Sequence, residues 1–108
     1  MRRGDLVPVA LPGEFGKPRP ALVVQSDHFE DHPTVTVLPL TSSLREAPLL
    51  RIMLRPDSAN GLRSTSQVMI DKAMTVRREK LGDVFGRVAV DAMLEIERRL
   101  ALFLGIAK

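Results

Sequence analysis

The chain has 108 residues, which is room for a single domain spanning residues 1–108. Its 44% hydrophobic and 27% charged residues are typical of a globular protein, and its formal net charge of +3 permits an anionic partner such as nucleic acid without demanding one. The absence of cysteine excludes disulfides, thiolate nucleophiles and zinc sites built from cysteine.

The first part of the chain predicts two strands joined by a loop. Residues 5–10 alternate loosely between apolar and polar and contain Pro8, so they predict an edge strand. Residues 11–18 hold two prolines and two glycines, a composition that predicts a loop. Residues 20–25 form a continuous run rich in apolar and β-branched side chains, which predicts a central strand.

The middle of the chain predicts three further strands. After a polar connection over residues 26–33, residues 34–38 alternate cleanly, and we expect this strand to close at Pro39. Residues 49–54 and 66–70 are short apolar runs on either side of a segment rich in turn-forming residues. Each of these two runs therefore predicts a strand.

The last part of the chain predicts a helical turn over residues 77–81, a short strand over residues 83–88 and a terminal helix. The helix covers residues 91–104, with Asp91 at its N-cap and Gly105 ending it. Its apolar side chains recur at helical spacing: Met93, Ile96, Leu100, Phe103 and Leu104. Together these elements predict a mainly β fold with a C-terminal helix (α+β), arranged as a small, bent antiparallel barrel.

The apolar and aromatic content also bears on location and partners. No apolar stretch reaches the ~20 residues that span a bilayer, and the first residues lack the apolar run of a signal peptide. We therefore expect a cytoplasmic protein with no membrane partner. Tyr and Trp are absent and there are four Phe, so RNA binding is expected to rest mainly on backbone and polar contacts rather than on stacking.

Both histidines of the chain, His28 and His32, lie in one polar segment. Their spacing matches no metal-binding signature. We interpret the segment as a solvated loop and expect no metal site there.

Two polar segments lie beside predicted strands. Glu14, Lys17 and Arg19 bring three charges into the loop before the central strand, where functional residues are often carried by a rigid scaffold. Hydroxyl groups cluster at Thr41 and Ser42, where the next strand ends. Taken alone, these are also the features of an ordinary surface loop and of an ordinary turn.

Four short segments, taken together, resemble one family. They occur in order at residues 3–5 (RGD), 19–25 (RPALVVQ), 39–42 (PLTS), and 75–76 with 80–81 (TV and KL). In this pattern the chain is similar to the MazF/PemK (Kid) toxins of type II toxin–antitoxin systems, and the similarity covers essentially the whole chain. It implies an SH3-like barrel of the CcdB/PemK type.

The resemblance also implies an activity and partners. It implies a sequence-specific endoribonuclease (mRNA interferase) that cuts single-stranded mRNA through attack by the substrate's 2′-OH, without a metal or other cofactor. It further implies a homodimer that arrests growth and is neutralised by a small acidic antitoxin protein.

Site residues carry over at matching positions. Arg19 matches the family's catalytic arginine, which would stabilise the charged phosphorane. Thr41 matches its catalytic threonine or serine, which would orient the scissile phosphate, and Glu14 matches a loop glutamate that we take as the preferred general base.

Three further residues are expected to contact RNA: Lys17 beside the catalytic arginine, Ser42 beside the threonine, and Asp71 at an acidic position near the family's RNA groove. Some family members carry arginine where Met69 or Met74 stands here, so a second cationic contact is expected to be missing.

Two alternatives stay open at this point. A CcdB-like DNA gyrase inhibitor is one, because residues 103–106 (FLGI) are similar to the aromatic-Gly-Ile end of that family, although Leu104 stands where it has tryptophan. A non-catalytic SH3-like module that binds RNA or protein is the other. The presence of both Arg19 and Thr41 favours the ribonuclease.

Overall fold

The computed structural model describes residues 1–11 and 17–107. In this part of the chain the elements, in order, are β1 (Asp5–Val9), β2 (Arg19–Val23), η1 (Asp27–Phe29), β3 (Thr34–Thr41), β4 (Arg51–Leu54), β5 (Ser66–Met69), η2 (Ile70–Lys72), β6 (Met74–Arg77), η3 (Arg78–Lys80), β7 (Gly86–Arg87) and α1 (Val90–Phe103). The η elements are single 3-10 turns. The predicted mainly β fold with a C-terminal helix is confirmed.

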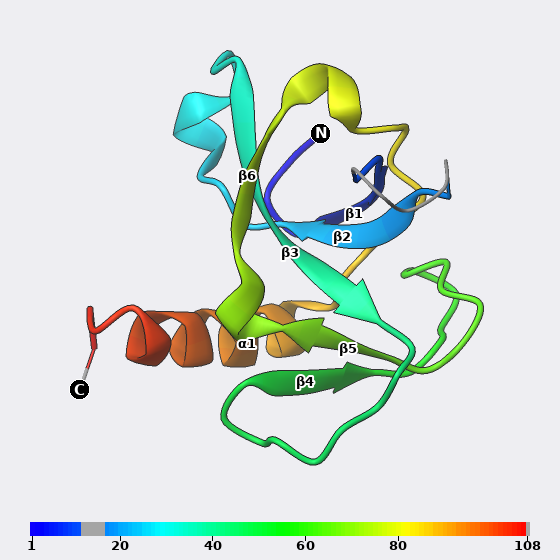
Figure 1. Ribbon diagram of the computed structural model, residues 1–108, viewed down its shortest axis with the longest axis vertical. Helices are drawn as coiled ribbons and strands as arrows, with labels where there is room; N and C mark the ends of the chain where they lie inside the picture. The colour runs from blue at the N-terminus through cyan, green and yellow to red at the C-terminus, as the bar shows by residue number, and fades with distance from the viewer. Residues whose placement is uncertain (12–16, 108) are drawn as a thin grey trace.

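The strands form one curled antiparallel sheet in the order β4-β5-β3-β2-β1-β7, with β6 pairing β3 outside this path. β3 is the longest strand and crosses the middle of the molecule (Figure 1). Its first half pairs with β6, its middle with β2 and its end with β5. This sharing of one long strand curls the sheet into a half-barrel, with α1 beneath it.

The core lies on both faces of the sheet, because successive residues of a strand point to opposite faces. One cluster faces α1: Leu6, Leu22, Val24, Leu38, Leu40, Leu54, Val68, Ile70, Val88, Met93 and Ile96. The other lies on the opposite face: Val7, Val9, Ala21, Val23, Val35 and Val37. Burial on both faces explains why the second predicted strand is a continuous apolar run.

The first strand is not at an edge, contrary to the sequence prediction. β1 pairs with β2 on one side and with β7 on the other. Pro8 lacks an N–H, but its carbonyl still accepts a hydrogen bond from the Gly82 N–H at 2.9 Å. The proline is tolerated because β7 is only two residues long and pairs with Asp5 and Leu6 rather than with Pro8.

The third strand also does not close at Pro39 as predicted but continues to Thr41. Along one side of β3, residues 34–37 pair with β6 and residues 40–41 pair with β5. Pro39 therefore falls in the gap between the two pairings, where a missing N–H breaks no ladder. Thr41 is therefore the last residue of β3 rather than part of the loop that follows.

Other boundaries differ by a few residues. β4 begins at Arg51 rather than at residue 49, because residues 48–50 form a turn. β7 is shorter than the predicted strand, while η3 confirms the predicted helical turn. β6 was not predicted, because its four residues alternate between half-buried and exposed side chains and give no strong apolar signal.

The terminal helix is confirmed, with a different start. Its N-cap is Ala89, which makes no side-chain capping bond, and Asp91 lies in the first turn instead of at the cap. There its charge complements the positive end of the helix dipole. The chain then leaves the helix at Gly105, whose φ of 75° is in the left-handed region that glycine favours.

The predicted apolar stripe of α1 is only partly buried. Met93 and Ile96 are in the core and Leu100 packs against it, whereas Phe103 and Leu104 are exposed. Nowhere in the described residues is a helix both long enough and apolar enough to cross a membrane.

Candidate functional site

A hollow of about 350 Å³, here called the central hollow, lies between the start of β2 and the end of β3. Its lining residues are Leu11, Arg19, Pro39, Leu40, Thr41, Met69, Lys72 and Met74. The sheet register explains why two predicted site residues meet here. Ala21 pairs with Pro39 in the last pair of the β2–β3 ladder. Arg19 lies two residues before Ala21 and Thr41 two residues after Pro39, so both line the hollow just beyond the end of that ladder. Arg19 is exposed and Thr41 is half-buried.

The Thr41 hydroxyl is held by the turn that follows β3. Its Oγ1 accepts a hydrogen bond from the Ser43 N–H at 3.0 Å, which leaves the hydroxyl proton available to donate. The backbone of Thr41 pairs with Gln67 of β5. The Gln67 side chain in turn exchanges two hydrogen bonds with the Arg45 backbone, at 2.8 and 2.9 Å, which fixes the turn.

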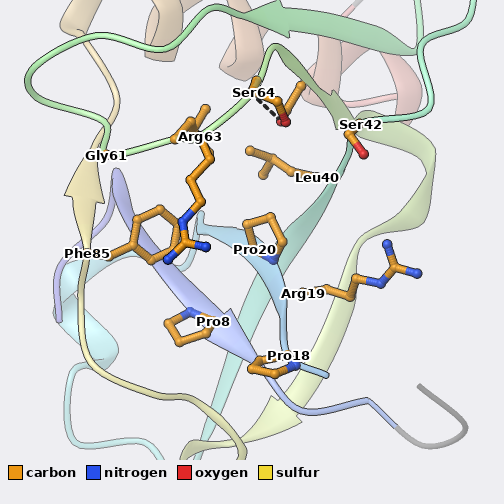
Figure 2. Close-up of a pocket in the computed structure, with 12 residues that line it drawn as sticks. Pro8, Pro18, Arg19, Pro20, Leu40, Ser42, Gly61, Arg63, Ser64 and Phe85 are labelled. Atoms are coloured by element: carbon orange, nitrogen blue, oxygen red, sulfur yellow. Dashed lines mark hydrogen bonds between the residues drawn. The ribbon is translucent and has the colours of Figure 1, made fainter. Parts of the chain in front are cut away.

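A second hollow of about 570 Å³, the Phe85 hollow, adjoins the first (Figure 2). Its lining residues are Pro8, Pro18, Arg19, Pro20, Leu40, Ser42, Gly61, Leu62, Arg63, Ser64, Ser66 and Phe85. Arg19 and Leu40 line both hollows. Ser42, predicted to contact RNA, therefore lines this second hollow together with Arg19 and does not line the central hollow.

A third hollow of about 540 Å³, the Asp71 hollow, adjoins the central one on its other side. Its lining residues are Thr41, Ser43, Arg45, Ala47, Leu50, Arg51, Met69, Asp71 and Lys72. Thr41, Met69 and Lys72 line both the central and the Asp71 hollows. Neighbouring hollows share lining residues, and the three adjoining hollows together are here called the groove.

Asp71, which lies in η2, lines the Asp71 hollow. Its Oδ2 lies 3.8 Å from the Lys72 ammonium. Its Oδ1 is buried and has no hydrogen-bond partner among the described residues. A carboxylate oxygen in this state is an unfilled acceptor beside the hollow that Thr41 also lines.

The groove is cationic. Among its described lining residues, the positively charged side chains are Arg19, Arg45, Arg51, Arg63 and Lys72, and the one carboxylate is Asp71. A cleft lined by one sign of charge raises the local concentration of an oppositely charged ligand. The groove therefore favours an anion far more than the modest net charge of the chain indicates.

Sequence reasoning missed four of these cations: Arg45, Arg51, Arg63 and Lys72, which follows Asp71 in η2. Arg45, Arg51 and Arg63 come from the β3–β4 turn, from β4 and from the segment before β5, and none belongs to a recognisable motif. Arg51 is the backbone partner of Met69, one of the positions where a cation was expected to be missing. The register thus brings a positive side chain to that part of the groove from the neighbouring strand.

One predicted residue of the described part of the chain is not brought into the groove. Lys17 is exposed and lines none of the three hollows. Glu14 lies outside the described residues.

The two histidines lie away from the groove. His28 and His32 are both exposed, the first within η1, and the His32 ring meets the edge of the Phe29 ring at a centroid distance of 6.5 Å. Across residues 1–11 and 17–107, no group of three or more His, Asp or Glu side chains is placed to hold a metal ion.

The RGD segment performs a structural task. The Arg3 N–H donates to Asp27 at 2.8 Å, and the Arg3 guanidinium pairs with Glu97 of α1 at 3.0 Å. The buried Asp5 pairs with Arg87 of β7. The hydrogen bond from Arg3 lowers the pKa of Asp27 below its ordinary value. These contacts tie the first strand to β7 and α1, so the segment supports the groove from behind.

Comparison with known proteins places this geometry in a family. A family model described as "PemK-like, MazF-like toxin of type II toxin-antitoxin system" matches residues 2–104. A protein of Mycolicibacterium smegmatis named "Probable endoribonuclease MazF" is 48% identical over 108 residues, 99% of each chain.

Solved structures agree. The fold superposes with a TM-score of 0.84 on an endoribonuclease in complex with its cognate antitoxin from a mycobacterial species, at 27% identity over 100% of this chain and 98% of that one. The Mycobacterium tuberculosis toxin MazF-mt6 has the same fold, with a TM-score of 0.79 at 22% identity over 94% of this chain and 96% of its own.

These similarities do not favour the two alternatives, a CcdB-like gyrase inhibitor and a non-catalytic binding module. The family model spans β1 through α1, including both strands that position Arg19 and Thr41. The chain belongs to the PemK-like, MazF-like toxin family of type II toxin–antitoxin systems.

Proposed function

We propose that this toxin is a sequence-specific, metal-independent endoribonuclease that cuts single-stranded mRNA, and that the groove binds the RNA. The observation that carries the proposal is the placement of Arg19 and Thr41 on adjacent strands in the central hollow. The name of the relative that is 48% identical, an endoribonuclease, supports the same reaction class.

Cleavage without a metal uses the substrate itself as the nucleophile. The ribose 2′-OH attacks the adjacent phosphorus, the bond from phosphorus to the 5′ oxygen breaks, and the products are a 2′,3′-cyclic phosphate and a 5′-OH. The proton of the 2′-OH passes to a base, and the leaving oxygen gains a proton from an acid. A cation stabilises the phosphorane between these two steps.

The groove offers groups for these tasks. Arg19 presents a planar cation that can bind two phosphate oxygens at once. An arginine side chain stays protonated and is a poor proton donor, so we assign it electrostatic stabilisation. Thr41 would donate its O–H to a phosphate oxygen, and its hydroxyl is already oriented by Ser43. Glu14, five residues before Arg19, is the proposed base.

The remaining contacts would hold the strand. Ser42 and Asp71 extend the groove on opposite sides of the central hollow, and Lys17 adds charge to the loop before Arg19. DNA lacks the 2′-OH that the reaction consumes, so it would bind the cations without being cut.

We also infer the partners. The endoribonuclease from a mycobacterial species was solved with its cognate antitoxin, which supports a protein antitoxin here. A cationic groove favours an acidic, partly disordered segment that folds on binding. The exposed apolar side chains of α1, such as Leu102 and Phe103, support a homodimer, and cytoplasmic action would follow from an mRNA substrate.

The experiment is cleavage of a long single-stranded RNA in EDTA, with a matched substrate carrying 2′-deoxyribose at the mapped cut site. We expect the first to be cut and the second to survive. Arg19→Ala should cut RNA far more slowly than the wild type, whereas Arg77→Ala, which removes an exposed arginine of β6 that lines no part of the groove, should cut normally. Cleavage of the deoxy substrate, or near-full activity of Arg19→Ala, would refute the mechanism.

A further inference from the structure

The Phe85 hollow is built differently from the rest of the groove. Part of its wall is apolar, with the phenyl ring of Phe85 and the rings of three prolines, including Pro20 beside Arg19, and three serines also line it. Arg19 and Arg63 also line the hollow. Figure 2 shows Phe85 and Arg63 extending toward it, while the Arg19 guanidinium extends away from the Phe85 ring. An apolar platform flanked by two cations is complementary to a nucleotide, which joins a flat base to anionic phosphates.

The Phe85 ring is fixed while part of its surface stays open. The side chain is 39% exposed, and the Phe85 N–H donates to the Leu6 carbonyl at 3.0 Å. A Cβ added to Gly61 would lie 2.5 Å from the Phe85 carbonyl oxygen and 3.3 Å from its Cδ1. The ring therefore packs directly on the glycine backbone, which holds one edge in place.

The segment that carries Arg63 is also ordered before any ligand arrives. Asn60 is 3% exposed, and its Oδ1 accepts from the N–H groups of Asp57 and Leu62 at 3.1 and 3.0 Å. Its Nδ2 donates to the Arg55 carbonyl at 2.8 Å. A preformed loop loses little further freedom on binding, which favours a specific site over a chance surface depression.

We propose that the Phe85 hollow binds the base of the nucleotide next to the scissile phosphate. The base stacks on Phe85, and the phosphates on either side contact Arg19 and Arg63. The nucleotide is adjacent to the cut because Arg19 lines both this hollow and the central one. The volume of about 570 Å³ lies within the range of small-ligand sites, about 300–1,000 Å³.

This subsite rests on the proposed ribonuclease function and changes one expectation drawn from composition. The shortage of aromatic residues indicates that RNA is held without stacking. One of the four Phe residues, however, lies exposed beside the central hollow. A single well-placed ring is enough to hold one base, and differences in stacking strength give a modest preference among bases at that position.

The test uses a short RNA with 2′-deoxyribose at the cut site, which binds without being cut, and with fluorescent 2-aminopurine at each neighbouring position in turn. We expect quenching at one position adjacent to the cut in the wild-type protein. Phe85→Ala should lose that quenching and weaken binding about 5- to 150-fold. Phe85→Tyr should retain both, and Phe29→Ala, which removes a 57% exposed ring outside the groove, should match the wild type.

Two controls distinguish loss of the proposed subsite from loss of the fold and from absence of ribonuclease activity. If Phe85→Ala fails to fold, Arg63→Ala keeps the ring and should still weaken RNA binding. The salt dependence of the RNA affinity should then decrease by about one released counterion. Unchanged affinity in a folded Phe85→Ala variant, or unchanged affinity in Arg63→Ala, overturns the proposed subsite. If the wild-type protein still cuts RNA in that case, the proposed ribonuclease function is not affected. A wild-type protein that cuts no RNA overturns both.

Discussion

Replacement of Thr41 by valine separates catalysis from folding. Valine keeps the β-branched shape that suits the end of β3, and the backbone pairing of Thr41 with Gln67 does not use the side chain. The intramolecular hydrogen bond lost is the one from the Ser43 N–H, at 3.0 Å on the surface. Its loss should cost about 0.5–1.5 kcal/mol of the free energy of unfolding.

The expected effect on the reaction is larger. Removal of one hydroxyl that donates to a developing oxyanion typically lowers kcat about 100- to 1,000-fold, or about 2.7–4 kcal/mol. We therefore expect Thr41→Val to melt near the wild-type temperature and to cut RNA at least about a hundredfold more slowly under single-turnover conditions.

Thr75→Val is the matched control for this substitution. Thr75 is an exposed threonine of β6 whose hydroxyl hydrogen-bonds that of Thr36, also at 3.0 Å, and it lines none of the three hollows. It should keep the wild-type rate. Wild-type cleavage by Thr41→Val, or an equal loss in Thr75→Val, would refute the role given to the Thr41 hydroxyl.

Two further predictions concern the scaffold. Ile96→Ala removes a fully buried side chain and should lower the free energy of unfolding, measured by urea titration, by about 2–5 kcal/mol. Leu94 is 49% exposed, so Leu94→Ala should lower it far less. Equal losses in the two variants would contradict the packing of α1. The pKa of Asp27 is lowered in the folded state, so its contribution to stability is present above the carboxyl's ordinary pKa of 3.8 and is lost as pH falls through the lowered value. Melting temperatures should therefore fall less steeply in this acid range for Asp27→Asn than for the wild type, and parallel curves would contradict the shift.

The fold was largely predictable because the burial of strands and of one helix face produces clear apolar patterns in the sequence. The continuous run that forms β2 and the helical spacing of Met93 and Ile96 both follow from it. The failures occurred where tertiary structure overrides local signals. Pro39 suits the interior of β3 because the neighbouring strands leave a gap there, and no property of the residue itself predicts that gap.

The site was predictable only in part. Arg19 and Thr41 were found through motifs, and the pairing of β2 with β3 then explains why both line the central hollow. The other cations converge from segments far apart in the chain, so no local pattern marks them. Phe85 was missed for the same reason, since its exposure depends on how closely it packs against Gly61.

The claim that Arg19 and Thr41 act together on one phosphate is tested most directly by a double-mutant cycle. Single-turnover cleavage of one RNA would be measured for Arg19→Ala, Thr41→Val and the double variant, each shown to be folded. Residues that act as a unit give strongly non-additive losses. We predict that the double variant is about as slow as the slower single variant. Losses that multiply in full would show that the two side chains act independently and would contradict the shared site.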